Sequence, residues 1–153
     1  MFENSHMKEA YAQAVEAFEK DEAPVGVVIV HHERDEIVLK VYNQMRMRKD
    51  PTAHAEMIAI QTLSQILKSE RLDAYDIYVT LEPCAMCAAA ISYARFNALY
   101  FGAYDVKSGG VEHGAKFFEQ KTCHHRPTVF GGILAKKNRA LIQKFFKQKR
   151  GAV

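Results

Sequence analysis

The chain has 153 residues and a net charge of +3, and 48% of its residues are hydrophobic, including nine Phe and seven Tyr. This length suits one domain and this apolar content suits a real core, so residues 1–153 are expected to form a single domain. The composition excludes a membrane-spanning chain, the first residues lack the features of a secretion signal, and three cysteines argue against a disulfide framework. We therefore expect a cytoplasmic protein.

The first part of the chain predicts one helix and two strands. Apolar residues from Ala10 to Phe18 recur at helical spacing, which predicts a helix over residues 5–20. A continuous apolar run at residues 25–30 predicts a strand that is buried on both faces. Residues 37–42 are expected to pair with this strand across a charged turn, as a hairpin.

The rest of the chain continues to alternate between helices and strands. In chain order we expect a helix after Asp50-Pro51-Thr52, a strand at 77–81, a buried helix at 88–93, a strand at 98–103, a loop at 104–110, a short helix at 112–120, a short strand at 127–130 and a last helix containing Leu134 to Phe145. This alternation predicts the α/β class, as a three-layer α/β/α sandwich around a mixed sheet of about five strands.

Two short segments carry the side chains of a metal site: His54-Ala55-Glu56 and Pro83-Cys84-Ala85-Met86-Cys87. One imidazole and two thiolates are good zinc ligands, and three protein ligands leave the fourth tetrahedral position open for water or substrate. Pro83 suits the first turn of a helix, on which Cys84 and Cys87 would share one face. The spacing predicts a catalytic site that holds one Zn²⁺ per subunit.

Glu56 is expected to work beside the zinc ion and not as a ligand. Two positions apart in a regular helix, Glu56 and His54 would point about 200° apart. If His54 begins the helix that Glu56 continues, the carboxylate can face the metal-activated water and move its proton. We therefore predict His54, Cys84 and Cys87 as metal ligands and Glu56 as the catalytic general acid and base.

Simpler interpretations of these residues exist. A C-x-x-C pair also occurs in redox proteins and zinc ribbons, and H-x-E alone carries almost no information. A non-catalytic zinc or RNA-binding module would need a fourth protein ligand. The candidates for that ligand are Cys123, His113, His124 and His125.

Charge is distributed unevenly along the chain. No acidic residue follows Glu119, and nine basic residues give the last 34 residues a charge of +9. Since the whole chain carries +3, the first 119 residues carry −6. A basic end of this kind is found both in solvated helices and in proteins that bind a polyanion, and the function of the predicted zinc site decides between these two explanations.

The combination of H-x-E and P-C-x-x-C is the signature of zinc nucleobase deaminases. Within that superfamily, which includes the cytidine and deoxycytidylate deaminases, nearly the whole chain resembles the bacterial tRNA-specific adenosine deaminases. The segments that carry the resemblance are Glu22–Gly26, Asp50–Glu56, Thr80–Cys84, Phe101–Gly109, Gly132–Ala135 and Phe145–Phe146.

The resemblance implies a cytidine deaminase-like fold, a homodimer, and deamination of adenosine to inosine at the wobble position of the tRNA anticodon loop. It also implies a set of substrate-binding positions: Asn43, Val25, Ala55, Ala85, Asp105, Lys107, Phe146, Lys149 and Arg150. From the residues alone, Asn43 also suits a turn, and Phe145 suits the core as well as RNA. The chain departs from the family pattern at Tyr104 and at Gly109–His113, which affects the loop contacts and not the chemistry.

A deaminase of a free base or nucleoside, of the guanine or cytosine type, is the main alternative function. It would have the same zinc site and would not need the basic end of the chain. The salt dependence of activity separates the two functions. Activity on RNA would fall steeply with added salt, because contacts to phosphates release counterions.

Overall fold

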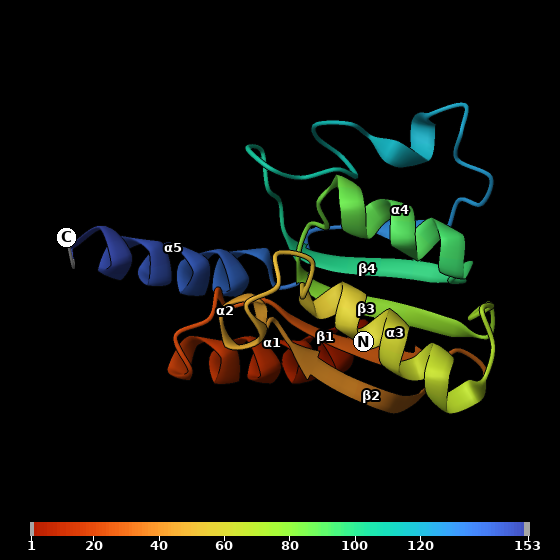
Figure 1. Ribbon diagram of the computed structural model, residues 1–153, viewed down its shortest axis with the longest axis horizontal. Helices are drawn as coiled ribbons and strands as arrows, with labels where there is room; N and C mark the ends of the chain where they lie inside the picture. Colours follow the sequence, from red (N-terminus) through yellow and green to blue (C-terminus); the bar gives the residue numbers. More distant parts are fainter. Residues whose placement is uncertain (1, 152–153) are drawn as a thin grey trace.

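The computed structural model describes residues 2–151, which form one five-stranded sheet between two layers of helices (Figure 1). This arrangement confirms the predicted three-layer α/β/α sandwich. In chain order the elements are α1 (Phe2–Glu19), β1 (Gly26–His31), β2 (Glu36–Tyr42), α2 (Met45–Arg48), α3 (Ala55–Leu67), β3 (Tyr75–Leu81), α4 (Ala85–Ala94), β4 (Ala98–Ala103), the 3-10 helix η1 (Phe117–Glu119), β5 (Thr128–Phe130) and α5 (Ala135–Gly151).

The sheet is mixed, with the strand order β2-β1-β3-β4-β5. β1 is antiparallel to both β2 and β3, whereas β3, β4 and β5 are parallel to one another. As a result, the start of β1 and the ends of β2, β3 and β4 all lie at the same edge of the sheet. The segment that precedes β1 and the segments that follow β2, β3 and β4 therefore lie close together.

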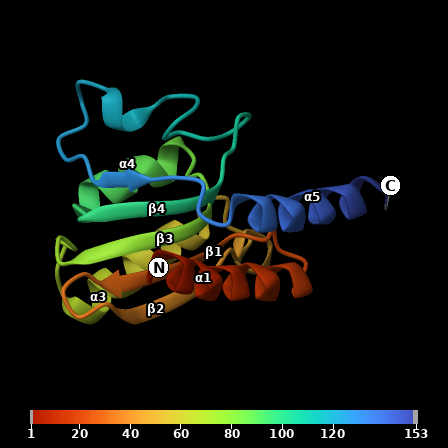
Figure 2. The same ribbon diagram turned by 180° about the vertical axis from the view of Figure 1, so that it is seen from behind.

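Both faces of the sheet are covered. α3 and α4 lie over one face, and α1 and α5 over the other, as the two opposite views show (Figures 1 and 2). Val27 and Ile29 of β1 belong to the larger apolar cluster, which includes the inner faces of α3 and α4. Val28 packs in a second cluster with Met7 and Ala10 of α1. Alternate residues of β1 thus point to opposite layers, which confirms the strand buried on both faces.

Three details differ from the sequence prediction. The helix predicted over residues 112–120 is wrong, because only η1 is helical there. Gly114 and Lys116 have φ values of 56° and 44°, in the left-handed region, which a right-handed α-helix cannot contain. The cysteine helix begins at Ala85, so that Cys84 is its N-cap and Pro83 precedes it. The first helix begins at Phe2, three residues earlier than expected.

None of the helices within residues 2–151 is long and apolar enough to cross a membrane. α5 continues well past the edge of the sheet (Figure 1). Three of its basic residues, Arg139, Lys149 and Arg150, line one hollow with Leu81 and Asp105 at the edge where the strand ends converge.

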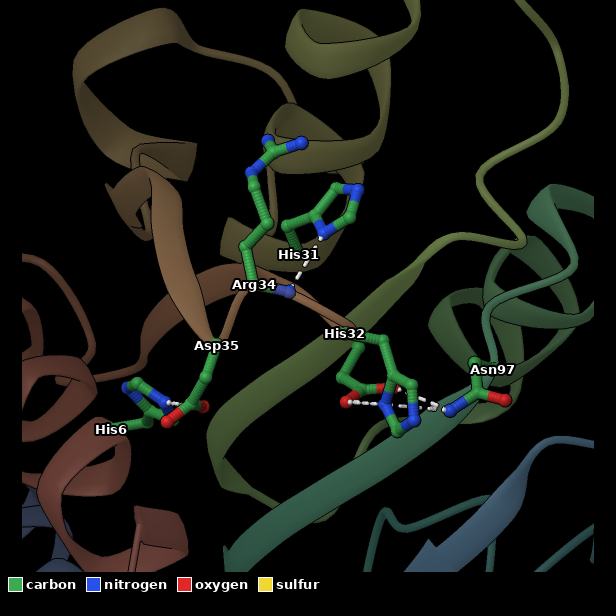
Figure 3. Close-up of polar contacts among 7 residues, drawn as sticks. His6, His31, His32, Arg34, Asp35 and Asn97 are labelled. Atoms are coloured by element: carbon green, nitrogen blue, oxygen red, sulfur yellow. Dashed lines mark hydrogen bonds and ion pairs between the residues drawn. The ribbon is translucent and has the colours of Figure 1, made fainter.

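The opposite edge of the sheet carries a polar network (Figure 3). The His32 ring bonds the Asp76 carboxylate at 2.8 Å, and the Asn97 amide donates to the same carboxylate at 2.9 Å. Nearby, the His6 ring contacts Asp35 at 2.6 Å, which ties α1 to the β1–β2 turn. These contacts connect β1, β3 and β4 at the ends that lie away from the converging loops.

This network predicts a stability that depends on pH. The hydrogen bond to Asp76 raises the pKa of His32 above its usual 6.5. The bond therefore contributes stability that is fully present below pH about 6.5 and is lost as the pH rises through the raised pKa. We expect His32→Gln to lower the melting temperature more at pH 5.5 than at pH 9. Thermal unfolding followed by circular dichroism checks this, and equal losses at both pH values would contradict it.

Candidate functional site

Four segments that are distant in sequence converge at the edge where the strand ends meet. Val25 precedes β1, Asn43 follows β2, Glu82 follows β3 and Asp105 follows β4. The N-termini of α3 and α4 lie at the same edge, because α3 follows β2 and α2, and α4 follows β3 directly. Ligand sites in α/β sheets gather outside such strand ends, and the chemistry predicted from the sequence lies here.

His54, Cys84 and Cys87 come together as predicted. His54 is the N-cap of α3, Cys84 is the N-cap of α4, and Cys87 lies in the first turn of α4. The His54 Nδ1 atom lies 3.7 Å from Cys84 Sγ and 3.5 Å from Cys87 Sγ. Around a tetrahedral zinc, bond lengths of about 2.3 Å to sulfur and about 2.0 Å to nitrogen separate such atoms by about 3.5–3.8 Å. Both nitrogen–sulfur distances therefore match a shared zinc ion, and all three donor atoms lie within 4.8 Å of one another.

The two thiols differ in how easily they ionise. Hydrogen bonds from the Cys87 thiol and the His54 ring lower the pKa of Cys84 to about 4, so Cys84 is a thiolate at neutral pH. The interaction with Cys84, together with burial, raises the pKa of Cys87. Cys87 is thus the ligand whose proton leaves when a metal binds, since only the thiolate coordinates zinc.

Glu56 lies in the first turn of α3, buried beside the three ligands with only 4% of its surface exposed. Because His54 is in extended backbone conformation before the helix, the 200° separation of a regular helix does not apply to this pair. Glu56 lines the same cavity as His54 and Cys84, and within residues 2–151 the three-residue ligand group does not include it. Burial raises the pKa of Glu56 to about 7, which suits a group that accepts and returns a proton near neutral pH.

Each of the four candidates for a fourth protein ligand either contacts another group or lines a hollow separate from the metal group. The His113 ring contacts Glu82 at 2.8 Å, and the His125 ring contacts the Phe96 carbonyl. Cys123 is a buried free thiol that donates to the His125 carbonyl, and His124 lines a separate hollow beside α4. In the described part of the chain, the metal group contains three ligands and no fourth. This arrangement leaves a coordination position open.

The cavity at the metal group has a volume of about 170 Å³. Of the predicted substrate-binding residues, Val25, Asn43, Ala55 and Asp105 line it, whereas Ala85 lines neither this cavity nor the larger hollow beside it. The Asn43 side chain also holds its own turn, because its amide donates to the Ala23 carbonyl at 3.2 Å. The rest of the wall was not predicted from the sequence and consists of Ala23, Met45, Leu81, Glu82 and Ser108.

A larger hollow of about 790 Å³ adjoins the cavity and shares five lining residues with it. Lys107, Phe146, Lys149 and Arg150, all predicted from the sequence, line this hollow. Phe146 is 49% exposed, while Phe145 is 6% exposed and packs edge-on against Phe18. The two neighbouring aromatic residues therefore have different surroundings, one in the hollow and one in the core.

The lining residues of this hollow that were not predicted as site residues include Tyr104, Val106, Arg139 and Ile142. A signal for two of them was present. Arg139 and Ile142 precede Phe146 by seven and four positions, so all three lie on one face of α5. The seven-residue spacing of Arg139 and Phe146 in one helix could therefore have predicted that Arg139 lies on the same surface as Phe146.

The unusual loop after β4 keeps its predicted position at the cavity. Asp105 and Ser108 line the wall, and the Glu112 side chain is exposed. Burial raises the pKa of the Glu82 carboxyl, but hydrogen bonds from the Asp105 amide and the His113 ring outweigh this effect and hold the pKa below its usual range. Glu82 is thus an anion that anchors the loop.

Comparison with known proteins agrees with this geometry. Residues 2–103 match the family described as the cytidine and deoxycytidylate deaminase zinc-binding region. The tRNA-specific adenosine deaminase of Rickettsia bellii is 48% identical over 94% of this chain and 99% of its own length. That of Agrobacterium fabrum is 46% identical over 98% of each chain. The family match and the His/Cys/Cys group together assign one zinc ion to the chain.

Solved structures give the same result for the fold. A structure from a study of A-to-I editing by tRNA deaminases at the wobble position superposes with a TM-score of 0.86, at 44% identity, over 90% of this chain and 98% of that one. A guanine deaminase from Nitrosomonas europaea, at 16% identity and a TM-score of 0.81 over 93% of this chain and 83% of that one, shares the fold alone. The chain therefore belongs to the family of tRNA-specific adenosine deaminases, within the zinc-dependent cytidine and deoxycytidylate deaminase superfamily.

Proposed function

We propose that this protein converts adenosine to inosine by hydrolytic deamination at the wobble position of the tRNA anticodon loop. The observation that carries the proposal is the open three-ligand site with buried Glu56, in a small cavity that adjoins a larger basic and aromatic hollow. The named activity of the relatives supports the same substrate. The whole chain would act as one deaminase domain, because α5 supplies part of the hollow.

In this mechanism His54, Cys84 and Cys87 hold the zinc ion. When bound, zinc lowers the pKa of water from about 15.7 towards about 7 and so supplies a nucleophile at neutral pH. Glu56 takes the proton that water loses, delivers it to the ring nitrogen next to C6, and then assists the departure of ammonia. The overall reaction consumes one water, replaces the amino group by oxygen and releases ammonia.

The two hollows suit a flipped nucleotide. A base within a stack cannot reach the metal group, so an unpaired loop nucleotide must turn outward. The inner cavity, with Asn43 in its wall, would take the target base. The outer hollow would take the neighbouring nucleotides, with Phe146 stacking on a base and Lys107, Lys149 and Arg150 contacting phosphates.

The basic end of α5 predicts that the affinity for RNA depends on the salt concentration. We expect Lys149→Ala/Arg150→Ala to weaken binding of an anticodon stem-loop and to reduce the slope of log Kd against log salt by about 1.4, the value for two contacts to single-stranded phosphates. Filter binding from low to moderate salt measures this slope. Lys121→Ala/Lys136→Ala removes the same charge from exposed positions outside the hollow. If this control pair changes the slope equally, the contacts are not at Lys149 and Arg150.

The choice between RNA and a free base can be tested directly. We expect an RNA stem-loop with a wobble adenosine to be deaminated, and free guanine, cytosine and adenosine to react far more slowly or not at all. Ammonia release from each substrate, with the same enzyme preparation, gives the comparison. Conversion of a free base alone would replace the RNA substrate by the nucleobase alternative.

We also propose that the chain acts as a homodimer in the cytoplasm, where its tRNA substrate is found. Tyr93 on the outer face of α4 is 76% exposed, which is unusual for a large aromatic residue and suits a contact with a second copy. A dimer would present two basic surfaces to RNA.

A further inference from the structure

Two carboxylates beside the cavity are buried and have no lysine or arginine partner in the described part of the chain. Glu22 is 1% exposed and Glu82 is 2% exposed. Burying an ionised carboxylate is costly unless hydrogen bonds replace its water. Both groups obtain these bonds from backbone amides of segments that line the cavity.

Glu82 has five hydrogen-bonding contacts. Its Oε2 atom accepts from the amides of Val111, Glu112 and His113 at 3.2, 2.9 and 3.1 Å. Its Oε1 atom accepts from the Asp105 amide at 3.0 Å and contacts His113 Nδ1 at 2.8 Å. One buried carboxylate thus binds both ends of the loop that places Asp105 and Ser108 in the cavity wall.

The loop is also packed closely against the start of the metal-binding helix. A Cβ atom added at Gly110 would lie 2.5 Å from the Ala85 nitrogen, and one added at Gly109 would lie 2.4 Å from Glu82 Oε2. The Gly110 amide donates to the Pro83 carbonyl at 2.8 Å. The position of the loop is therefore set relative to Cys84.

Glu22 holds the other side of the cavity in the same way. Its two oxygens accept from the amides of Arg46 and Met47 at 2.9 and 2.7 Å. These amides follow directly after Asn43 and Met45, which line the cavity. β2 and β4, from which the two segments leave, flank β1 and β3 in the sheet, so the two carboxylates hold the cavity from its two sides.

We infer that Glu22 and Glu82 are positioning residues for the deamination reaction: each holds one wall of the substrate cavity at a set distance from the metal group. The inference rests on the proposed function and adds to it two residues that act through the backbone amides they bind, Glu82 from the cavity wall and Glu22 from behind it. Both oxygens of each carboxylate act as acceptors. Glutamine would therefore place an NH₂ donor against at least one backbone N–H, at nearly unchanged volume.

Amide hydrogen exchange tests the inference without substrate. We expect Glu82→Gln to speed exchange at Val111, Glu112 and His113 by about tenfold or more while exchange at Arg46 and Met47 stays unchanged. Glu22→Gln should give the reverse pattern. Exchange that rises across the whole chain in either variant, or that does not change at the named amides, would overturn the inference.

Kinetics on the anticodon stem-loop complete the test. We expect KM to rise by about tenfold in Glu82→Gln and by about threefold in Glu22→Gln, with zinc content unchanged and with kcat within about threefold of wild type. The matched controls are Glu112→Gln, on the same loop, and Glu19→Gln, near Glu22, because both side chains are exposed. Their KM should stay within about twofold of wild type.

The kinetic outcomes separate the inference from the proposed function. A fall in zinc content and kcat at unchanged KM would show that the carboxylates only maintain folding, and it would overturn the positioning role. Wild-type enzyme that leaves the stem-loop unchanged would refute the proposed function instead. The exchange pattern can be determined in either case.

Discussion

Glu56→Gln is expected to lower kcat for adenosine deamination by at least about 10³-fold while one zinc ion remains bound. General acid and base catalysis by one positioned group contributes about 10²–10⁴-fold, and Glu56 serves in more than one proton transfer. The amide has a similar volume and cannot carry the proton. Because Glu56 lies outside the ligand group of His54, Cys84 and Cys87, its replacement should leave metal affinity nearly intact.

Two measurements on the same sample check this expectation. Metal content is determined by atomic absorption, and single-turnover conversion of the stem-loop gives the rate. Glu70→Gln, an exposed acid in the loop that follows α3, should keep wild-type activity. Substantial activity in Glu56→Gln or Glu56→Ala would remove Glu56 from the mechanism, and loss of zinc would make it a ligand.

Cys84→Ala is expected to remove both the zinc ion and the activity. The site has three protein ligands in the described residues, so the loss of one leaves two. Changes in groups that merely orient metal ligands already cost about 10–100-fold in metal affinity, and a direct ligand should cost more. We expect less than about one tenth of the wild-type zinc after dialysis, and no detectable inosine.

The third cysteine supplies the control for that variant. Cys123 is free and buried but lies outside the metal group, beside the Ser92 hydroxyl and the His125 carbonyl. Cys123→Ala should therefore keep one zinc ion and most of the activity, at a modest cost in stability. A Cys84→Ala protein that retains its zinc, or a Cys123→Ala protein that loses it, would contradict the assigned ligand set.

Much of the fold follows from local pattern. The continuous apolar run of β1 is buried on both faces because alternate residues meet α1 on one side and α3 and α4 on the other. The metal group was predictable because its residue types are rare and their chemistry is demanding. The prediction that Glu56 continues a helix begun by His54 is also confirmed, since His54 caps α3.

The remaining features depend on contacts that sequence spacing does not reveal. The helix predicted at residues 112–120 fails because Gly114 and Lys116 adopt left-handed backbone conformations, in a segment that Glu82, about 30 positions earlier, anchors through three backbone amides. Glu22 lies in a segment that carries the resemblance, but its role was not predictable because its partners are backbone amides, which any residue type can supply. Ala85 was placed at the substrate by resemblance alone, and in the structure it lines neither hollow.

The most direct test of the central claim is the position of inosine in a reacted RNA. The substrate is an anticodon stem-loop with adenosine at the wobble position and a second adenosine elsewhere in the same loop. We predict one inosine per molecule, at the wobble position, as read by nuclease digestion and mass spectrometry, and none with Glu56→Gln enzyme. Inosine at the second adenosine alone, or no inosine while a free base is converted, would contradict the account.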